Sequence, residues 1–188
     1  MKHGLIRKIK REILLSVVLL ALAVLAGVFF AHFNPEEAGI AVQELARELE
    51  AYSAEDPATQ AMVIFIHNSQ IDFLLIVAGV FFGIVPLLIL LFNGYYMGIV
   101  LYVASAEIGA GTVLLATIPH GILEIPAIII SCAYGFWLGT KLYRRAKYGE
   151  PLKQHLKDAI YAFVVIILPL NFVAAILEVF VSAALIRG

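Results

Sequence analysis

The sequence predicts an all-α, polytopic transmembrane bundle of five spanning helices with an additional amphipathic helix at its outer surface. Of the 188 residues, 62% are hydrophobic and 14% are charged, and the mean hydropathy is +0.96. Five apolar stretches have, or nearly have, the roughly 20 residues that a helix needs to cross a bilayer. This composition lies outside the range of soluble globular domains, so we expect a single integral membrane domain over residues 1–188.

The first expected span covers residues 13–33 and follows the basic segment MKHGLIRKIKRE. The apolar run is about as long as a full span and ends at AHFNPEE without a convincing small-residue cleavage site. We therefore expect a retained anchor and not a cleaved signal peptide.

The next element is an expected outer helix over residues 35–52, with Asn34 and Pro35 at its start. Its apolar side chains recur at three-and-four spacing: Ala38, Ala41, Val42, Leu45, Leu49 and Tyr52. Glutamates occupy most of the opposite face, which is the pattern of an amphipathic helix. Such a helix can pack on the protein's own outer surface, on a second copy of the chain, or on a partner protein.

Four further spans are expected at residues 60–82, 84–106, 112–140 and 159–186. Their orientation follows from charge. Lysine and arginine cluster in two places: Lys2, Arg7, Lys8, Lys10 and Arg11, then Lys141, Arg144, Arg145, Lys147, Lys153 and Lys157. Residues 34–58 instead carry seven acids and one base. The positive-inside rule then predicts a multi-pass cell-membrane protein with its N-terminus cytoplasmic and its C-terminus outside.

Four acids fall inside the apolar stretches or at their edges: Asp72, Glu107, Glu124 and Glu178. No lysine or arginine lies within the spans to neutralise them. Glu107 is expected in an outer turn, where water can hydrate it. A charged acid at mid-bilayer costs about 2.5 kcal/mol or more, so the other three indicate a polar site inside the bundle.

Counting residues from the outer ends of the spans places a set of polar side chains at similar depths. The expected pocket, in the outer half of the membrane, consists of Asn68, Asp72, Asn93, His120, Glu124, Asn171 and Glu178. Asn68 and Asp72, like His120 and Glu124, are one helical turn apart and share a face. Prolines near these residues predict distorted helices, which commonly border cavities in membrane proteins.

Three kinds of chemistry remain open for this pocket. The polar groups can form a structural hydrogen-bond network, or the carboxyl groups can relay protons or cations. A third possibility is a divalent cation such as zinc, with ligands drawn from His120, Glu124, Glu178, Asp72 and His67. No serine or cysteine nucleophile has an obvious partner, so catalytic residues are not identified and an enzyme is not favoured.

The segments NSQIDFLLIVAG, GIVPLLILLFNGYYMG, IPHGILEIPA and PLNFVAAILE give the chain a family resemblance. It resembles the stage II sporulation protein M (SpoIIM) family of polytopic membrane proteins over nearly its full length. The most specific element is His120-Gly121-x-x-Glu124-x-Pro126. In endospore formers the family member is implicated in engulfment, as a membrane scaffold for partners that degrade peptidoglycan. The resemblance therefore implies a scaffold or partner-binding role.

The first functional expectation is accordingly a scaffold or assembly protein whose pocket is structural. The alternatives are a proton- or cation-coupled transporter or channel, and a zinc-dependent intramembrane hydrolase. The expected partners are membrane lipid, a second copy of the chain in a homodimer, and other membrane proteins. Nucleic-acid binding is not expected.

Overall fold

The structure is a computed structural model that describes residues 2–50 and 56–182. Within these ranges, the side chains of residues 2, 3, 48–50, 116, 117, 119, 120, 181 and 182 are not described. The elements are α1 (Lys2–Lys8), α2 (Lys10–Phe33), α3 (Pro35–Glu50), α4 (Pro57–Val77), η1 (Ala78–Val80), α5 (Ile84–Ile108), α6 (Ala110–Tyr148), α7 (Lys153–Ala162), η2 (Phe163–Ile167), α8 (Leu168–Leu177) and η3 (Glu178–Ser182). No strand occurs in the described ranges.

Five helical segments are long and apolar enough to cross a membrane: Lys10–Phe33, Pro57–Val80, Ile84–Ile108, Gly121–Tyr148 and Lys153–Phe180. The predicted all-α class, with five spans and an outer helix, is confirmed. The outer helix α3 reaches Glu50, and the last two residues of its expected range lie outside the described part of the chain.

The helices that contain the last two expected spans extend beyond the apolar stretches that predicted them. We expected the fourth span to end at residue 140 and a basic linker to follow. Instead α6 continues to Tyr148, which makes it about 58 Å long at the usual helical rise. Gly149, in the left-handed conformation at φ 73°, ends it. The fifth helical segment begins at Lys153, and the end of its expected range, residues 183–186, lies outside the described chain.

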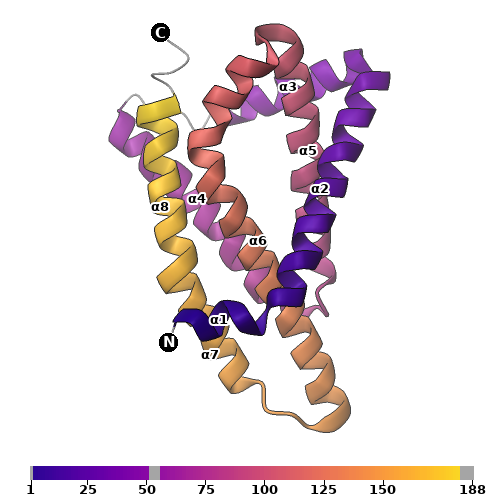
Figure 1. Ribbon diagram of the computed structural model, residues 1–188, viewed down its shortest axis with the longest axis vertical. Coiled ribbons are helices and arrows are strands. Elements are labelled where there is room, and N and C mark those ends of the chain that lie inside the picture. The colour runs from indigo at the N-terminus through magenta and orange to yellow at the C-terminus, as the bar shows by residue number, and fades with distance from the viewer. Residues whose placement is uncertain (1, 51–55, 183–188) are drawn as a thin grey trace.

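The spanning helices form two pairs that α6 joins (Figure 1). Helices α2 and α5 pack against each other, as do α4 and α8, and α6 contacts all four. In the view of Figure 1, α6 slants between the pairs, α3 lies across one end of the bundle, and α1 and α7 lie at the other. The long α6 is therefore the element that holds the two pairs together.

The α2–α5 pair is close because glycines face the neighbouring backbone. A Cβ atom added at Gly98 would lie 2.1 Å from the carbonyl oxygen of Val24, and one at Gly27 would lie 2.0 Å from that of Tyr95. Neither position has room for a side chain. This is the small-residue packing by which helices associate in membranes, where lipid removes the hydrophobic drive between them.

Proline affects α6 and the last span differently. The helix α6 is continuous across Pro119 and Pro126, so the expected distortion does not break it. Before Pro169, however, the chain forms the π-helical segment η2, whose wider turn replaces the regular helical bonding pattern. A π-helical turn is one way in which a helix accommodates a proline, which lacks the backbone N–H donor.

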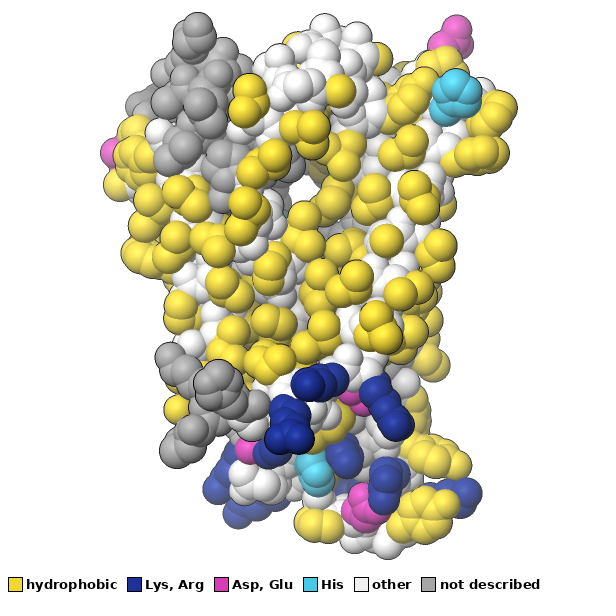
Figure 2. Space-filling model, viewed as in Figure 1, with side chains coloured by type: hydrophobic (Ala, Val, Ile, Leu, Met, Phe, Trp, Pro, Cys, Tyr) yellow, Lys and Arg dark blue, Asp and Glu magenta, His cyan; other side chains and the backbone are white. Residues whose placement is uncertain are grey.

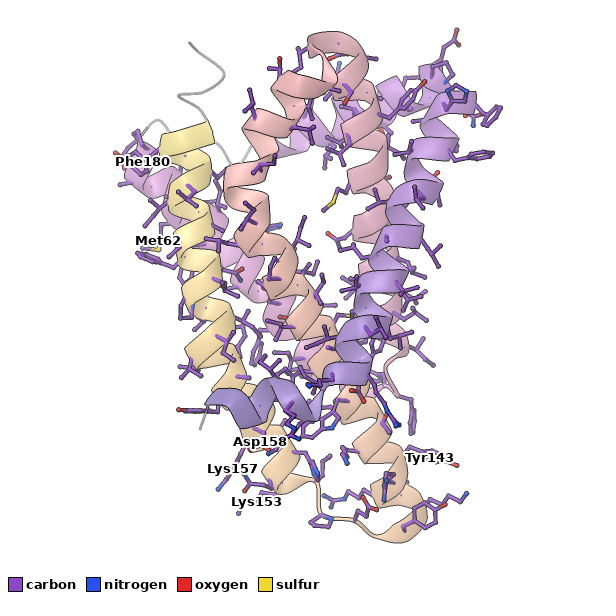
Figure 3. All side chains as sticks on the ribbon, viewed as in Figure 1. Met62, Tyr143, Lys153, Lys157, Asp158 and Phe180 are labelled. Atoms are coloured by element: carbon purple, nitrogen blue, oxygen red, sulfur yellow. The ribbon has the colours of Figure 1, made fainter. Side chains whose placement is uncertain are left out.

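Charge divides the molecule along its long axis. Figure 2 shows Lys and Arg side chains gathered at one end, beyond a broad hydrophobic band. At this end Lys8 of α1 forms an ion pair of 2.5 Å with Asp158 of α7. Figure 3 shows Asp158 beside α1. The two basic segments of the sequence thus lie on the same side of the bundle, opposite α3. Which membrane face this end occupies stays a prediction.

Candidate functional site

A cavity of about 200 Å³ lies among α2, α4, α5, α6 and α8. Figure 2 shows the surface hollowed in the half of the molecule away from the basic end. The lining residues are Leu20, Asn68, Ile71, Asp72, Asn93, Met97, Gly121, Glu124, Ile125, Ile128 and Asn171. Of the seven residues expected in a polar pocket, five are on this list: Asn68, Asp72, Asn93, Glu124 and Asn171.

Asp72 of α4 is the most buried carboxylate of the cavity, with 3% of its surface exposed. Its Oδ2 atom accepts a hydrogen bond of 2.7 Å from Nδ2 of Asn171 on α8. Its Oδ1 atom is buried and has no hydrogen-bond partner among the described residues. A buried polar atom without a partner is costly, so this oxygen is the point at which the site is open to a proton, a water molecule or a cation.

Glu124 of α6 is also bonded to α4. Asn68, one turn before Asp72, donates a hydrogen bond from Nδ2 to Oε1 of Glu124. The two asparagine–carboxylate pairs therefore connect α4 to α6 and α4 to α8. Three helices that are apolar on their outer surfaces are cross-linked by polar groups inside.

Asn93 reaches the cavity without joining helices. Its Nδ2 atom donates to the carbonyl oxygen of Ile89 at 2.8 Å, one turn earlier on α5. It contributes polarity to the α5 wall, and no described hydrogen bond crosses from this residue to α4 or α6.

The remaining predicted residues are placed differently. Glu178 is partly buried at the start of η3 and lies within electrostatic range of Glu124, but it is not among the cavity's lining residues. His67 is exposed and does not line the cavity either. His120 lies one turn before Glu124 in α6, and its side chain is outside the described part of the structure.

The structure describes four of the five side chains expected as metal ligands. Among the described side chains, no group of three or more His, Cys, Asp or Glu residues is placed to hold a metal ion. The set expected from sequence, His120, Glu124, Glu178, Asp72 and His67, includes one side chain outside that description. A zinc site therefore stays a prediction without geometric support.

One polar residue of the site escaped the sequence reasoning. Ser131 is fully buried and is a polar neighbour of Asp72, although its hydroxyl meets no hydrogen-bond geometry in the described structure. It follows Glu124 by seven residues, which places both on the same face of α6. This spacing is visible in the sequence and would have placed Ser131 on the pocket-facing side of α6.

Chemically, the cavity combines two carboxylates, three side-chain amides and an apolar rim. Its volume accommodates several water molecules, each of which needs polar partners such as these. The arrangement can anchor helices through the paired oxygens and can bind a proton or a small cation through the unpaired one. Among the described side chains that line the cavity, no nucleophile–base pair occurs.

Comparison with known proteins places the chain in a family. The model of the Stage II sporulation protein M family matches residues 16–183, which is most of the chain. The chain belongs to this family. Two uncharacterized proteins of Methanocaldococcus jannaschii are similar to this stage II sporulation protein M family member. The first is 32% identical over 123 residues, covering 63% of this chain and 68% of the relative. The second is 27% identical over 173 residues, covering 88% and 75%. No solved structure gives a significant match.

Proposed function

We propose that this protein is a membrane scaffold whose polar cavity is primarily structural. The observation that carries the proposal is the pair of bonds on α4, from Asn171 to Asp72 and from Asn68 to Glu124. Both carboxylates are engaged by an asparagine from a different helix. Interhelical hydrogen bonds of this kind hold helices together where lipid removes the hydrophobic driving force. Membership of the stage II sporulation protein M family supports the same role.

The surface proposed for assembly is the exposed side of α3. Its other side packs on the bundle, where Ala38 is fully buried beside Ile99 and Val42. Ile40 is 57% exposed, and Glu44 is also exposed. An apolar residue on an otherwise polar, solvent-facing side is suited to a partner protein that buries it.

Site-specific photo-cross-linking in native membranes tests this role. A photoreactive amino acid at Ile40 should give a discrete protein adduct. The same group at Leu22, 57% exposed on α2, should give none because that position faces lipid. An adduct containing only this chain would assign α3 to the predicted homodimer. Absence of any protein adduct at exposed positions of α3 would contradict the scaffold role.

A second function, proton- or cation-coupled transport, is favoured by one specific observation. The Oδ1 atom of Asp72 is buried without a partner and belongs to a residue that lines the cavity. Buried carboxylates of this kind mark ion and proton pathways in membrane proteins. Purified protein in sealed vesicles should then carry flux driven by a pH or cation gradient, and Asp72→Asn should abolish it. Equal flux in vesicles with and without protein would exclude transport of the tested ions.

The proposed topology places the N-terminus and the basic end in the cytoplasm and the C-terminus outside. Cysteine labelling with an impermeant reagent tests it, because the native Cys132 is fully buried. In intact cells, a cysteine at Glu44 should react and one at Lys147 should react only after permeabilisation. The reverse pattern would invert the topology.

A further inference from the structure

A second cavity, separate from the polar pocket, lies at the basic end of the molecule. Its volume is about 610 Å³, within the range of about 300–1,000 Å³ that is usual for small-molecule sites. Its walls come from α1, the first turn of α2 and the last third of α6. Figure 2 shows Lys and Arg side chains clustered directly beyond the hydrophobic band on this side.

The wall formed by α1 is held in place. Leu5 is 6% exposed and Ile9 is fully buried, and both belong to a core cluster that includes Ala159 and Tyr134. The ion pair between Lys8 and Asp158 adds a link to α7. In Figure 1, α1 runs across the direction of α2. A basic segment fixed across the end of the bundle forms a wall and not a loose tail.

Most of the bases that line this cavity form no ion pair with a described acid. Six of the lining residues are basic and one, Glu12, is acidic. Two of the bases are already engaged: Lys8 with Asp158, and Arg144 with Glu150. The other four, which form no ion pair with any described acid, are Arg7, Lys10, Arg11 and Lys141.

Trp137 supplies an apolar side to the cavity. It is 6% exposed, and Lys141 Nζ lies 5.6 Å from the centre of its ring. Arg11 is the second residue of the spanning segment Lys10–Phe33, and Trp137 lies four residues before Lys141, where the apolar run of α6 ends. Basic and aromatic residues in such positions are typical of the depth of lipid headgroups. The cavity therefore combines an excess of fixed cations with an aromatic residue at the level of the lipid phosphates.

We propose that this cavity binds the phosphate-bearing headgroup of an anionic phospholipid. Guanidinium and ammonium groups bind phosphate oxygens through charge-assisted hydrogen bonds. Basic pockets between helices near the membrane surface recognise anionic headgroups in this way. The depth of the cavity, beside apolar helix surface that can hold acyl chains, favours a lipid over a soluble phosphate compound.

The fluorescence of Trp137, the only tryptophan in the sequence, provides a local readout. The full-length protein is placed in phosphatidylcholine nanodiscs with a minor fraction of lipid brominated near its headgroup. Brominated phosphatidylglycerol should quench Trp137 more strongly than brominated phosphatidylcholine with the same acyl chains. Equal quenching by the two lipids would overturn the proposal.

Two triple variants with equal charge changes separate a built site from general surface attraction. Arg7→Gln, Lys10→Gln and Arg11→Gln together should lower the preference for phosphatidylglycerol about a hundredfold, since each base contributes about fivefold and the factors multiply. Lys147→Gln, Lys153→Gln and Lys157→Gln together should leave most of it, because these bases do not line the cavity; Figure 3 shows two of them projecting from α7. Equal losses in both variants would overturn the proposal.

Two further arms complete the test. If the first triple variant does not fold, as judged by its circular dichroism, Lys141→Gln alone should lower the preference about fivefold.

Inorganic phosphate or glycerol 3-phosphate, added to nanodiscs of phosphatidylcholine alone, should not change Trp137 fluorescence saturably. A saturable response to either compound would assign the cavity to a soluble phosphate ligand and overturn the lipid assignment.

Discussion

Single polar residues inside this protein matter because each has few alternatives to its native partner. Asn171 is 1% exposed and its amide bonds Asp72. Loss of this donor would leave the buried carboxylate oxygen without its protein partner, which is costly in a membrane interior. Asn93, whose amide bonds only its own helix, offers an internal comparison.

We expect Asn171→Leu to lower the free energy of unfolding by about 1–3 kcal/mol, the usual cost of a buried acceptor left unsatisfied. The double variant Asp72→Leu/Asn171→Leu should recover part of this loss, because it removes both partners. Reversible unfolding in detergent measures both, and Asn93→Leu, with only a local bond to lose, should cost less. Strictly additive effects of the two substitutions would show that the pair is not coupled.

The Asp56 cap makes the start of α4 sensitive to acid. Its carboxylate accepts from the Thr59 hydroxyl at 2.7 Å and the Thr59 amide at 2.8 Å, and these bonds lower the pKa of Asp56 below its ordinary value of 3.8. Because the folded pKa is the lower one, the cap stabilises the helix above pH 3.8 and is lost as the pH falls through the folded pKa.

Hydrogen exchange of the Thr59 amide, corrected for its intrinsic rate, should therefore show protection that falls at acidic pH. Asp56→Asn should keep most of the protection and lose its dependence on pH, since asparagine caps helices without titrating. Asp56→Ala should reduce protection at every pH. Unchanged acid dependence in the asparagine variant would assign the effect to another group.

Whole helices in this bundle are spaced by the size of the residues between them. The clearest example is the α2–α5 contact, where Gly27 and Gly98 each face the carbonyl oxygen of the other helix. A similar contact joins η1 to α6, since a Cβ atom at Gly79 would lie 2.3 Å from the carbonyl oxygen of Gly135. These helices approach so closely because neither surface has a side chain at the crossing point.

Gly98→Ala should consequently separate α2 from α5 and lower the free energy of unfolding by about 1–3 kcal/mol, as expected for overpacking. Gly39→Ala is the matched control: a Cβ atom there meets nothing within 4 Å, so it should be neutral or stabilising by up to about 1 kcal/mol. Thermal unfolding of the two variants checks this. An unaffected Gly98→Ala protein would mean that the helices can separate freely.

The whole molecule is unevenly packed. Near the middle of the bundle, Leu90 is fully buried and packs with Leu20 and Cys132. The cavity lined by Met97 lies further along α5 towards the α3 end, where space remains between the helix pairs. A larger side chain on α5 should therefore destabilise the protein less at a position that lines the cavity than at a position in the packed middle of the bundle.

We expect Met97→Phe to cost less than about 1.5 kcal/mol, because the ring can enter the cavity, and Leu90→Phe to cost about 1–3 kcal/mol. Denaturant titration in the same detergent gives both values. If Met97→Phe proves as costly as Leu90→Phe, the cavity is not free volume.

The predicted pocket shows where reasoning from sequence succeeds and where it stops. Depth along each span is a one-dimensional quantity, and it placed Asn68, Asp72 and Glu124 at a common level, where the structure has them lining one cavity. Rotation about each helix axis is not set by depth. For that reason the sequence grouped Glu178 with the lining residues, although it lies within electrostatic range of Glu124 without lining the cavity, and it missed Ser131.

By itself, the sequence determined the membrane class, the five spans, the outer amphipathic helix and the separation of charge between the two ends. These follow from local composition, because in lipid each segment must satisfy its own backbone hydrogen bonds as a helix. Only the tertiary structure decided that α6 joins two helix pairs, that Asn171 and Asn68 pair with Asp72 and Glu124, and that six bases line one cavity with Trp137. Those contacts depend on how helices rotate and cross, which is set by packing between residues far apart in the chain.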